Sequence, residues 1–386
     1  MSPTTMYHSP LSIPELLDQI LGFLDAEEDL RASALVRRAW IQPAQSRIFA
    51  SIHFGYNWWG RKELASARRL LAILDGSQHL ATFITALDLV KLNAAHLETL
   101  HKLVNLPFPH LTTLRIVDDG RTTFAEAESV AIQRLLRIPS LSSVTIQCEF
   151  QLWTQFLQIW QECSPNIRHL SYYTTLYGTS LPKDITGPSM GIHTRRIQLK
   201  SFSSWDSALR TRLWLQDERC PFDLSNLEAF EFYQSSDELL CDVLAGALDT
   251  VETLSIGPLA DISRFHRVTQ FAVVPHNGLY QDLKQIFALP ADYRARLKAL
   301  VVCVWPLPLP EIDPLLQLLS DIHNVFPSLE IIEIKFWATT EEARSKVESE
   351  TEDWFKTVHS RIKLSWGTGQ RFAVDYGGQT WHQRIV

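Results

Sequence analysis

The chain has 386 residues, enough to bury a substantial core in one large domain or two smaller ones. An apolar fraction of 46% and a charged fraction of 20% are typical of a folded protein and exclude long disordered stretches. A net charge of −7 argues against nucleic-acid binding as the main task, because such binding depends on clustered cations. No apolar run approaches the roughly 20 residues that a membrane helix needs.

Cysteine usage and the first residues indicate a cytoplasmic or nuclear protein. The five cysteines form no C-x-x-C pair, and the chain has no N-x-[ST] sequon. Residues 1–10 lack the basic start and the apolar core of a secretory signal. We therefore expect neither secretion nor a membrane partner.

The first predicted element is a helix near the start of the chain. Ser12 and Glu15 form an S-x-x-E capping box, with Pro14 in the first turn. Apolar residues then recur at helical spacing, at Leu16, Leu17, Ile20, Leu21 and Leu24. Asp25 and Glu28 repeat the cap signal for a second helix, and residues 40–49 carry a third helical pattern.

Three helices in about 40 residues cannot bury all their apolar groups among themselves, because so small a unit leaves much of its apolar surface in water. We therefore expect part of this surface to bind a partner. Basic residues gather in the same region, at Arg31, Arg37, Arg38 and Arg47. They indicate either a docking surface for an acidic partner or a solvated helix face.

This region resembles an F-box, the helical module that docks substrate receptors on the Skp-family adaptor of cullin-based ubiquitin ligases. The matching residues are Ile13-Pro14-Glu15-Leu16-Leu17, Ile20-Leu21, Leu24, Asp29-Leu30, Leu35-Val36, Arg38 and Trp40. The resemblance implies adaptor contacts through Ile13, Pro14, Leu16, Ile20, Leu24, Leu30, Val36 and Trp40. The alternative is an ordinary helical cap that packs on the rest of the chain.

An internal repeat dominates the chain after a helical linker over residues 55–80, whose helix we expect to end at Gly76. Its pattern is apolar-x-x-apolar-x-apolar. The copies are Ile84-Leu87-Leu89, Leu111-Leu114-Ile116, Leu141-Val144-Ile146, Ile167-Leu170-Tyr172, Leu227-Phe230-Phe232, Val251-Leu254-Ile256, Val268-Phe271-Val273, Leu297-Leu300-Val302 and Leu329-Ile332-Ile334, with a poorer copy at Leu199-Phe202.

Amphipathic stretches between the copies predict helices, at residues 94–104, 124–137, 152–163, 237–248, 279–287 and 312–325. In each copy the first, fourth and sixth positions face the helices, and the third, fifth and seventh face the other side of the sheet. Stacked copies then form one parallel sheet lined by helices.

These copies resemble the divergent leucine-rich repeats found behind F-boxes in fungal proteins. We therefore expect an α/β protein with a three-helix F-box, followed by a leucine-rich-repeat-like solenoid built on a parallel sheet. The expected parts are residues 1–54, the helical linker 55–80, the solenoid 81–336 and a C-terminal cap 337–386. We predict an excursion from the solenoid at 177–194, and in the cap a helix at 340–362 and a strand at 371–376.

One string suggests catalysis. Residues 187–191 (GPSMG) match the G-x-S-x-G nucleophile elbow, but the strand and the helix that should flank Ser189 are missing. The histidines form no metal-binding motif, and no glycine-rich phosphate loop is present. We expect no enzyme activity and no cofactor.

The exposed face of the sheet is the expected binding surface for a target protein. Its predicted residues are Thr113, Arg115, Val117, Ser143, Thr145, Gln147, His169, Ser171, Tyr173, Ala229, Glu231, Tyr233, Thr253, Ser255, Ile331, Glu333 and Lys335. Tyrosine and arginine often anchor interfaces, so Arg115, Tyr173, Glu231 and Tyr233 are the first candidates.

By resemblance, the chain is a substrate-recognition subunit of a Skp–cullin–F-box ubiquitin ligase that holds an unknown protein target. Two alternatives stay open: an adaptor-binding scaffold that degrades no target, and a hydrolase that uses Ser189.

Overall fold

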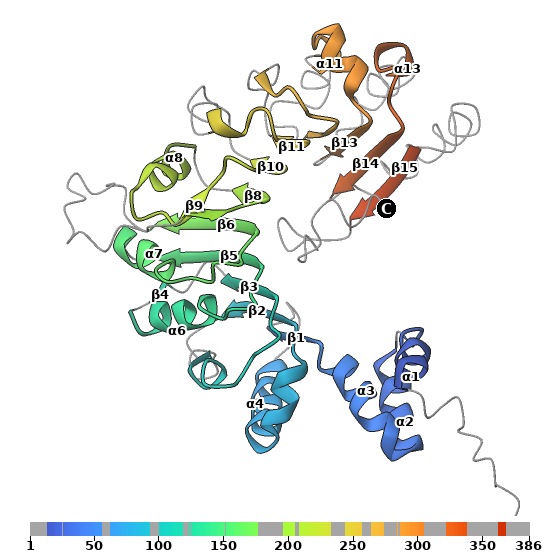
Figure 1. Cartoon of the computed structure of the whole chain (residues 1–386), viewed down its shortest axis with the longest axis vertical. Helices are drawn as coiled ribbons and strands as arrows, with labels where there is room; N and C mark the ends of the chain where they lie inside the picture. The colour runs from blue at the N-terminus through green and yellow to red at the C-terminus, as the bar shows by residue number, and fades with distance from the viewer. Residues whose placement is uncertain are drawn as a thin grey trace, which may run out of the picture. The chain divides into compact units, whose positions relative to one another are not determined.

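A computed structural model describes most of the chain. It covers residues 14–24, 26–55, 62–92, 100–118, 123–124, 126–150, 152–176, 196–204, 208–232, 244–256, 264–273, 284, 286–304, 322–337 and 362–367. The fold is of the mixed α/β class, with strands that pair in parallel (Figure 1). The chain divides into two compact units, one of residues 1–166 with 176–181 and one of residues 167–175 with 182–386.

The first unit begins with helices and continues with strands. Its helices are α1 (Pro14–Leu21), α2 (Glu27–Val36), α3 (Arg38–Ile48), α4 (Lys62–Gly76), the 3-10 helix η2 (Gln78–Phe83), α6 (Glu126–Leu136) and α7 (Trp153–Ile159). Its strands are β1 (Ser51–Gly55), β2 (Ala86–Leu92), β3 (Thr113–Asp118), β4 (Thr123–Phe124) and β5 (Ser143–Phe150). Strands β1, β2, β3 and β5 pair in that order, and the short β4 also pairs with β5.

The second unit contains the remaining strands. They are β6 (His169–Leu176), β7 (Ile197–Gln198), β8 (Ser201–Ser204), β9 (Phe222–Asp223), β10 (Ala229–Phe232), β11 (Thr253–Ile256), β12 (Gln270–Val273), β13 (Ala299–Val304), β14 (Ile331–Trp337) and β15 (Ile362–Gly367). Its helices are α8 (Ala208–Gln216), the 3-10 helix η3 (Ala245–Ala247), α11 (Ala291–Arg296) and α13 (Ile322–Val325). Strand β7 pairs with β9, and the other strands pair in parallel in chain order.

Each predicted repeat copy forms a strand whose apolar positions are buried where the structure describes them. In the copy that contains β3, for example, Leu111, Leu114 and Ile116 have no exposed surface. The poorer copy at Leu199 and Phe202 also forms a strand, β8, although its sixth position is the polar residue Ser204. The Ser204 hydroxyl is buried 3.0 Å from Thr211 Oγ1, so a polar residue is tolerated there.

The strands also begin in the same way. The N–H groups of Thr112 and Thr113 both donate to the carbonyl of Thr85, at 2.8 and 3.0 Å. The same two-donor arrangement is found at the carbonyls of Ala50, Thr85, Thr112, Arg168, Lys200, Glu228, Glu252, Thr269 and Lys298. This repeated hydrogen bonding fixes the register of each strand against the preceding one.

Helices α6 and α7 pack together beside the strands of the first unit (Figure 1). The buried side chains of α6 include Ile132 and Leu136, which follow the predicted helical spacing. The Gln133 side chain donates to the carbonyls of Gln158 and Gln161, at 3.1 and 3.3 Å, and so links the two repeats. The first, fourth and sixth strand positions supply the opposite wall of this core.

The structure differs from the sequence prediction at several points. Residues 51–54, assigned to the helical module, form most of β1, which pairs with β2. Strand β15 lies at 362–367, where no strand was predicted. Residues 245–247 form a 3-10 helix within the longer helix predicted for 237–248. Val117, Thr253 and Ser255 were predicted to be exposed but are buried, because a parallel sheet can be covered on both faces.

Candidate docking surface on helices α1 to α3

Helices α1, α2 and α3 enclose a small core. Leu17, Leu21, Leu30 and Ala44 are buried in it, and their partly buried neighbours are Leu24, Ala34, Trp40 and Ile48. The chain turns sharply after α1, where the N–H of Gly22 donates to the carbonyls of Asp18 and Gln19. A side chain at Gly22 would lie 3.0 Å from the Gln19 carbonyl and 3.2 Å from Arg47 Nη2, which favours glycine there.

The same helices leave large apolar side chains exposed. Leu35 is 88% exposed, Phe23 is 86% exposed and Val36 is 68% exposed. Leu16 and Ile20, one turn apart on α1, are each 40% exposed, and Ile41 on α3 is similar. Elsewhere in the described ranges, the large apolar side chains with comparable exposure are Ile73 and Leu152. Exposed apolar side chains are therefore concentrated in this helical region.

The residues predicted to contact an adaptor fall into three groups. Leu16, Ile20 and Val36 are exposed. Leu24 and Trp40 are partly buried against the core of the three helices, and Leu30 is buried within it. Ile13 and the side chain of Pro14 lie outside the described part of the chain. The prediction for Leu30 therefore has to be revised, because its side chain stabilises the module from within.

Sequence reasoning gave no adaptor-contact role to Phe23, Leu35 and Ile41. Phe23 follows the end of α1, so its side chain is not held by the helical spacing that marked its neighbours. Leu35 is adjacent to Val36 at the end of α2, and a run of two apolar residues does not reveal which of them faces inward. A helical projection that placed Leu30 and Ser33 inward would have left Leu35 outward.

Charged groups of these helices are partly paired within the module. Arg47 Nη2 donates to the Asp18 carbonyl at 2.7 Å and lies 3.0 Å from Asp18 Oδ1, which ties α3 to α1. Arg31 pairs with Glu27 on the same helix. Arg37 and Arg38, beside Leu35 and Val36 in the chain, are exposed. The basic cluster predicted from sequence is thus reduced to these two residues.

The predicted target-binding residues lie on strands of both units. Arg115 is half-buried, and its Nη1 lies 3.1 Å from Asp88 Oδ2. Tyr173 on β6 and Glu231 on β10 are also half-buried and interact with other residues. Tyr233 lies outside the described residues. The structure therefore holds Arg115 in an ion pair and leaves the role of all four residues a prediction.

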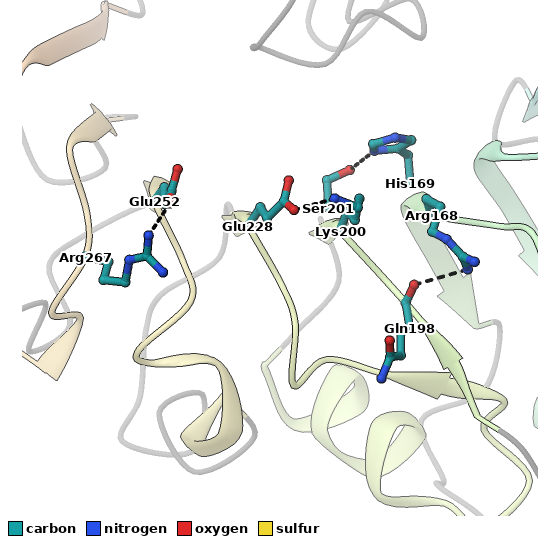
Figure 2. A network of polar contacts seen from close by, with 8 residues as sticks. All are labelled: Arg168, His169, Gln198, Lys200, Ser201, Glu228, Glu252 and Arg267. Atoms are coloured by element: carbon teal, nitrogen blue, oxygen red, sulfur yellow. Dashed lines mark hydrogen bonds and ion pairs between the residues drawn. The ribbon is translucent and has the colours of Figure 1, made fainter.

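Ion pairs and hydrogen bonds link successive repeats of the second unit where its strands begin (Figure 2). Lys200 pairs with Glu228, and Arg267 lies 2.8 Å from Glu252. His169 Nδ1 lies 2.9 Å from Ser201 Oγ, and Arg168 donates to the Gln198 carbonyl at 3.4 Å. The two ion pairs are exposed, and such pairs typically contribute about 0–1 kcal/mol each. These contacts lie where successive strands begin and do not resemble a catalytic site.

The ionisable groups of the second unit with an altered pKa include Asp217 and Cys220. Burial raises the pKa of the Asp217 carboxyl, but hydrogen bonds and the charge of Arg219 outweigh this effect, so the net pKa lies below its usual value. The two side chains form a bidentate pair at 2.7 and 2.8 Å. Burial raises the pKa of the Cys220 thiol to about 12, which leaves it protonated and unreactive at neutral pH.

The structure gives no support to catalysis at Ser189, because that residue lies outside the described ranges. Within those ranges, no group of three or more His, Cys, Asp or Glu side chains is arranged to hold a metal ion. The helices of the same ranges are all too short or too polar to cross a membrane.

Comparison with known proteins identifies no family. No family model matches the chain, and no curated protein matches it. Among solved structures, a Bacteroides fragilis protein determined as a structural genomics target matches with a TM-score of 0.32 and 11% sequence identity. The match covers 82% of this chain and 73% of the other. A likeness this weak says nothing about the function of either protein.

Proposed function

We propose that this chain is a substrate-recognition subunit of a Skp–cullin–F-box ubiquitin ligase, working in the cytoplasm or nucleus. The observation that supports this proposal is the exposed apolar surface of α1, α2 and α3. Large exposed apolar patches mark interaction sites, since leaving them in water has a free-energy cost. The sequence resemblance of residues 13–40 to an F-box gives the partner its identity, a Skp-family adaptor.

The adaptor would bind the exposed side chains of this module, while Leu17, Leu21, Leu30 and Ala44 hold its three helices together. Phe23 and Leu35, the two most exposed, join Leu16, Ile20 and Val36 as proposed anchors. Full burial of one such side chain contributes about 1.5–3 kcal/mol. Arg37 and Arg38 would place positive charge beside the apolar contact, which suits an acidic partner surface.

The strand repeats would form a leucine-rich-repeat-like solenoid that holds the target protein, with Arg115, Tyr173, Glu231 and Tyr233 as candidate contacts. Ubiquitin transfer would then need no catalytic group from this chain. Its contribution would be positional, because holding the target near the ubiquitin-carrying enzyme raises the effective concentration of the reacting groups.

A pull-down of the Skp-family adaptor with the full chain tests the proposal. Phe23→Asp combined with Leu35→Asp places charges on the proposed surface without touching the buried core, and we expect the adaptor to be lost. Leu152→Asp is the matched control, because Leu152 is an exposed leucine (57%) at the start of α7. If the unaltered chain fails to bind the adaptor, or the double variant still binds it, the proposal is wrong.

The same pull-down distinguishes a ligase subunit from an assembly scaffold. A ligase subunit should also recover a cullin through the adaptor. Recovery of adaptor without cullin would favour the scaffold. Leu24 and Trp40 are poor positions for this experiment, because both side chains pack on the internal core and their loss would disturb the helices themselves.

A further inference from the structure

Three side chains of β1 and β2 form a Ser–His–Asp arrangement on the polar face of the first unit. Ser51 Oγ lies 3.2 Å from His53 Nε2, and His53 Nδ1 lies 3.1 Å from Asp88 Oδ2. Ser51 and His53 are two residues apart on one strand, so both side chains lie on the same face. His53 and Asp88 are register partners on neighbouring strands, which brings the carboxylate to the imidazole.

This geometry selects one tautomer of His53. An ionised carboxylate only accepts hydrogen bonds, so Asp88 requires the imidazole proton on Nδ1. Nε2 is then left as an acceptor for the Ser51 hydroxyl. A neutral histidine in this tautomer can act as the general base for a serine nucleophile, with the carboxylate as its orienting group.

Arg115 and burial keep the carboxylate in place. Arg115 Nη1 lies 3.1 Å from the same Asp88 oxygen, and both of these side chains are only 16% exposed. Arg115 is the register partner of Asp88 on β3, so three successive strands position the group. Asp88 and Arg115 therefore form a fixed support beneath the exposed side chains of Ser51 and His53.

A substrate can reach Ser51, and a backbone N–H there can stabilise the negative charge that develops on the oxygen of an attacked carbonyl group. Its side chain and that of His53 are exposed, and the side chain of His53 is 70% exposed. The Ala50 carbonyl accepts the N–H of Ala86 on β2. Because alternate residues of a strand direct their backbone groups to opposite sides, the Ser51 N–H points away from β2. It can donate to the oxygen of a carbonyl group attacked by Ser51 Oγ.

We propose that Ser51, His53 and Asp88 form an acyl-transfer site that hydrolyses carboxylic esters, separate from the proposed docking surface. Ser51 Oγ attacks the ester carbonyl carbon while His53 Nε2 takes the hydroxyl proton. The bond to the alcohol then breaks, and His53 returns the proton to the leaving oxygen. Water, deprotonated by His53, attacks the acyl-serine, which releases the carboxylic acid and restores the Ser51 hydroxyl.

Labelling of the full-length protein with a fluorophosphonate probe, followed by peptide mass spectrometry, tests this proposal. We expect the phosphonyl group on Ser51. We expect His53→Ala to slow labelling by about 100-fold or more, the usual contribution of general base catalysis. Ser51→Ala should remove that label. The same variant should release nitrophenol from p-nitrophenyl acetate no faster than buffer alone does.

The Ser201 hydroxyl, 2.9 Å from His169 Nδ1, supplies the matched control, and Ser201→Ala should leave labelling unchanged. Thermal melting checks that each variant is folded. We expect the variants to fold, because the side chains of Ser51 and His53 are exposed. A folded protein with no label on Ser51, equal labelling of the His53→Ala variant, or a label on Ser189 alone would overturn the proposal. None of these results bears on adaptor binding, so the two proposals fail independently.

Discussion

The helices α1 to α3 and the strand repeats differ in how completely they bury their apolar side chains. In the repeats, the first, fourth and sixth positions of each copy are buried wherever they are described, because helices and neighbouring strands cover them. In the helices, adjacent residues such as Leu16 and Leu17 differ completely, one exposed and one buried. A stack of repeats can cover its apolar positions with its own chain, whereas the small helical unit leaves part of its apolar surface exposed among the described residues.

The largest stability effect should come from Phe230, which is buried in β10 and stacks on Phe202 and Phe232 with ring centroids 6.0 and 6.1 Å apart. Phe230→Ala should lower the free energy of unfolding by about 3–5 kcal/mol, because it removes buried surface and leaves a cavity. Phe23→Ala removes the same atoms from an 86% exposed position and should change the free energy of unfolding by less than about 0.5 kcal/mol. Urea denaturation of both variants measures the difference. Equal losses would show that Phe23 is part of a core.

An intermediate effect is expected at the pair of Asp217 and Arg219. Asp217→Asn should cost about 1–3 kcal/mol at neutral pH, because the half-buried guanidinium loses its charged partner. The pKa of Asp217 is lowered in the folded protein, so the stabilisation is present above the unfolded-state pKa of about 3.9. It is lost as the pH falls through the lower folded-state value.

Thermal melting of the unaltered protein and of the Asp217→Asn variant across this pH range tests the sign. The gap in melting temperature should narrow as the solution becomes more acidic. A gap that widens in acid would mean that the carboxyl is protonated in the folded protein near neutral pH, contrary to the geometry of the pair.

The smallest effect is expected at the exposed pair of Lys200 and Glu228 (Figure 2). Glu228→Gln should change the free energy of unfolding by no more than about 1 kcal/mol, and added salt should reduce the difference further. Denaturation at low and high salt measures it. A loss comparable to that of Phe230→Ala would contradict the view that apolar burial dominates the repeats.

The strand positions could be read from the sequence, because burial on one face imposes a fixed spacing that survives variation in residue type. The strands that escaped this reading include β1 and β15, and β8 was recognised only as a poorer copy of the repeat. In β1, Ile52 and Phe54 alternate, but they follow α3 so closely that Ile48 and Phe49 extend the helical pattern over the boundary. In β8, Ser204 breaks the apolar pattern, and only its contact with Thr211 reveals why it is buried.

The candidate surface was less predictable than the fold. Apolar spacing identified α1 and α2 as amphipathic, but each helix has apolar residues on more than one side. Whether Leu30 or Leu35 faces inward depends on where α3 packs, which is set by tertiary contacts such as the hydrogen bond from Arg47 to the Asp18 carbonyl. The Ser51, His53 and Asp88 group was equally hidden, because residues 35 positions apart meet only through strand register.

Titration of the purified chain with a purified Skp-family adaptor tests the central claim most directly. We expect binding by the unaltered chain and by Leu152→Asp, and a loss of affinity of at least about 100-fold when Phe23→Asp and Leu35→Asp are combined. That loss corresponds to about 2.7 kcal/mol, within the range for two anchors removed from a buried contact. Equal affinity of the double variant, or no binding by the unaltered chain, would contradict the assignment of this surface to an adaptor.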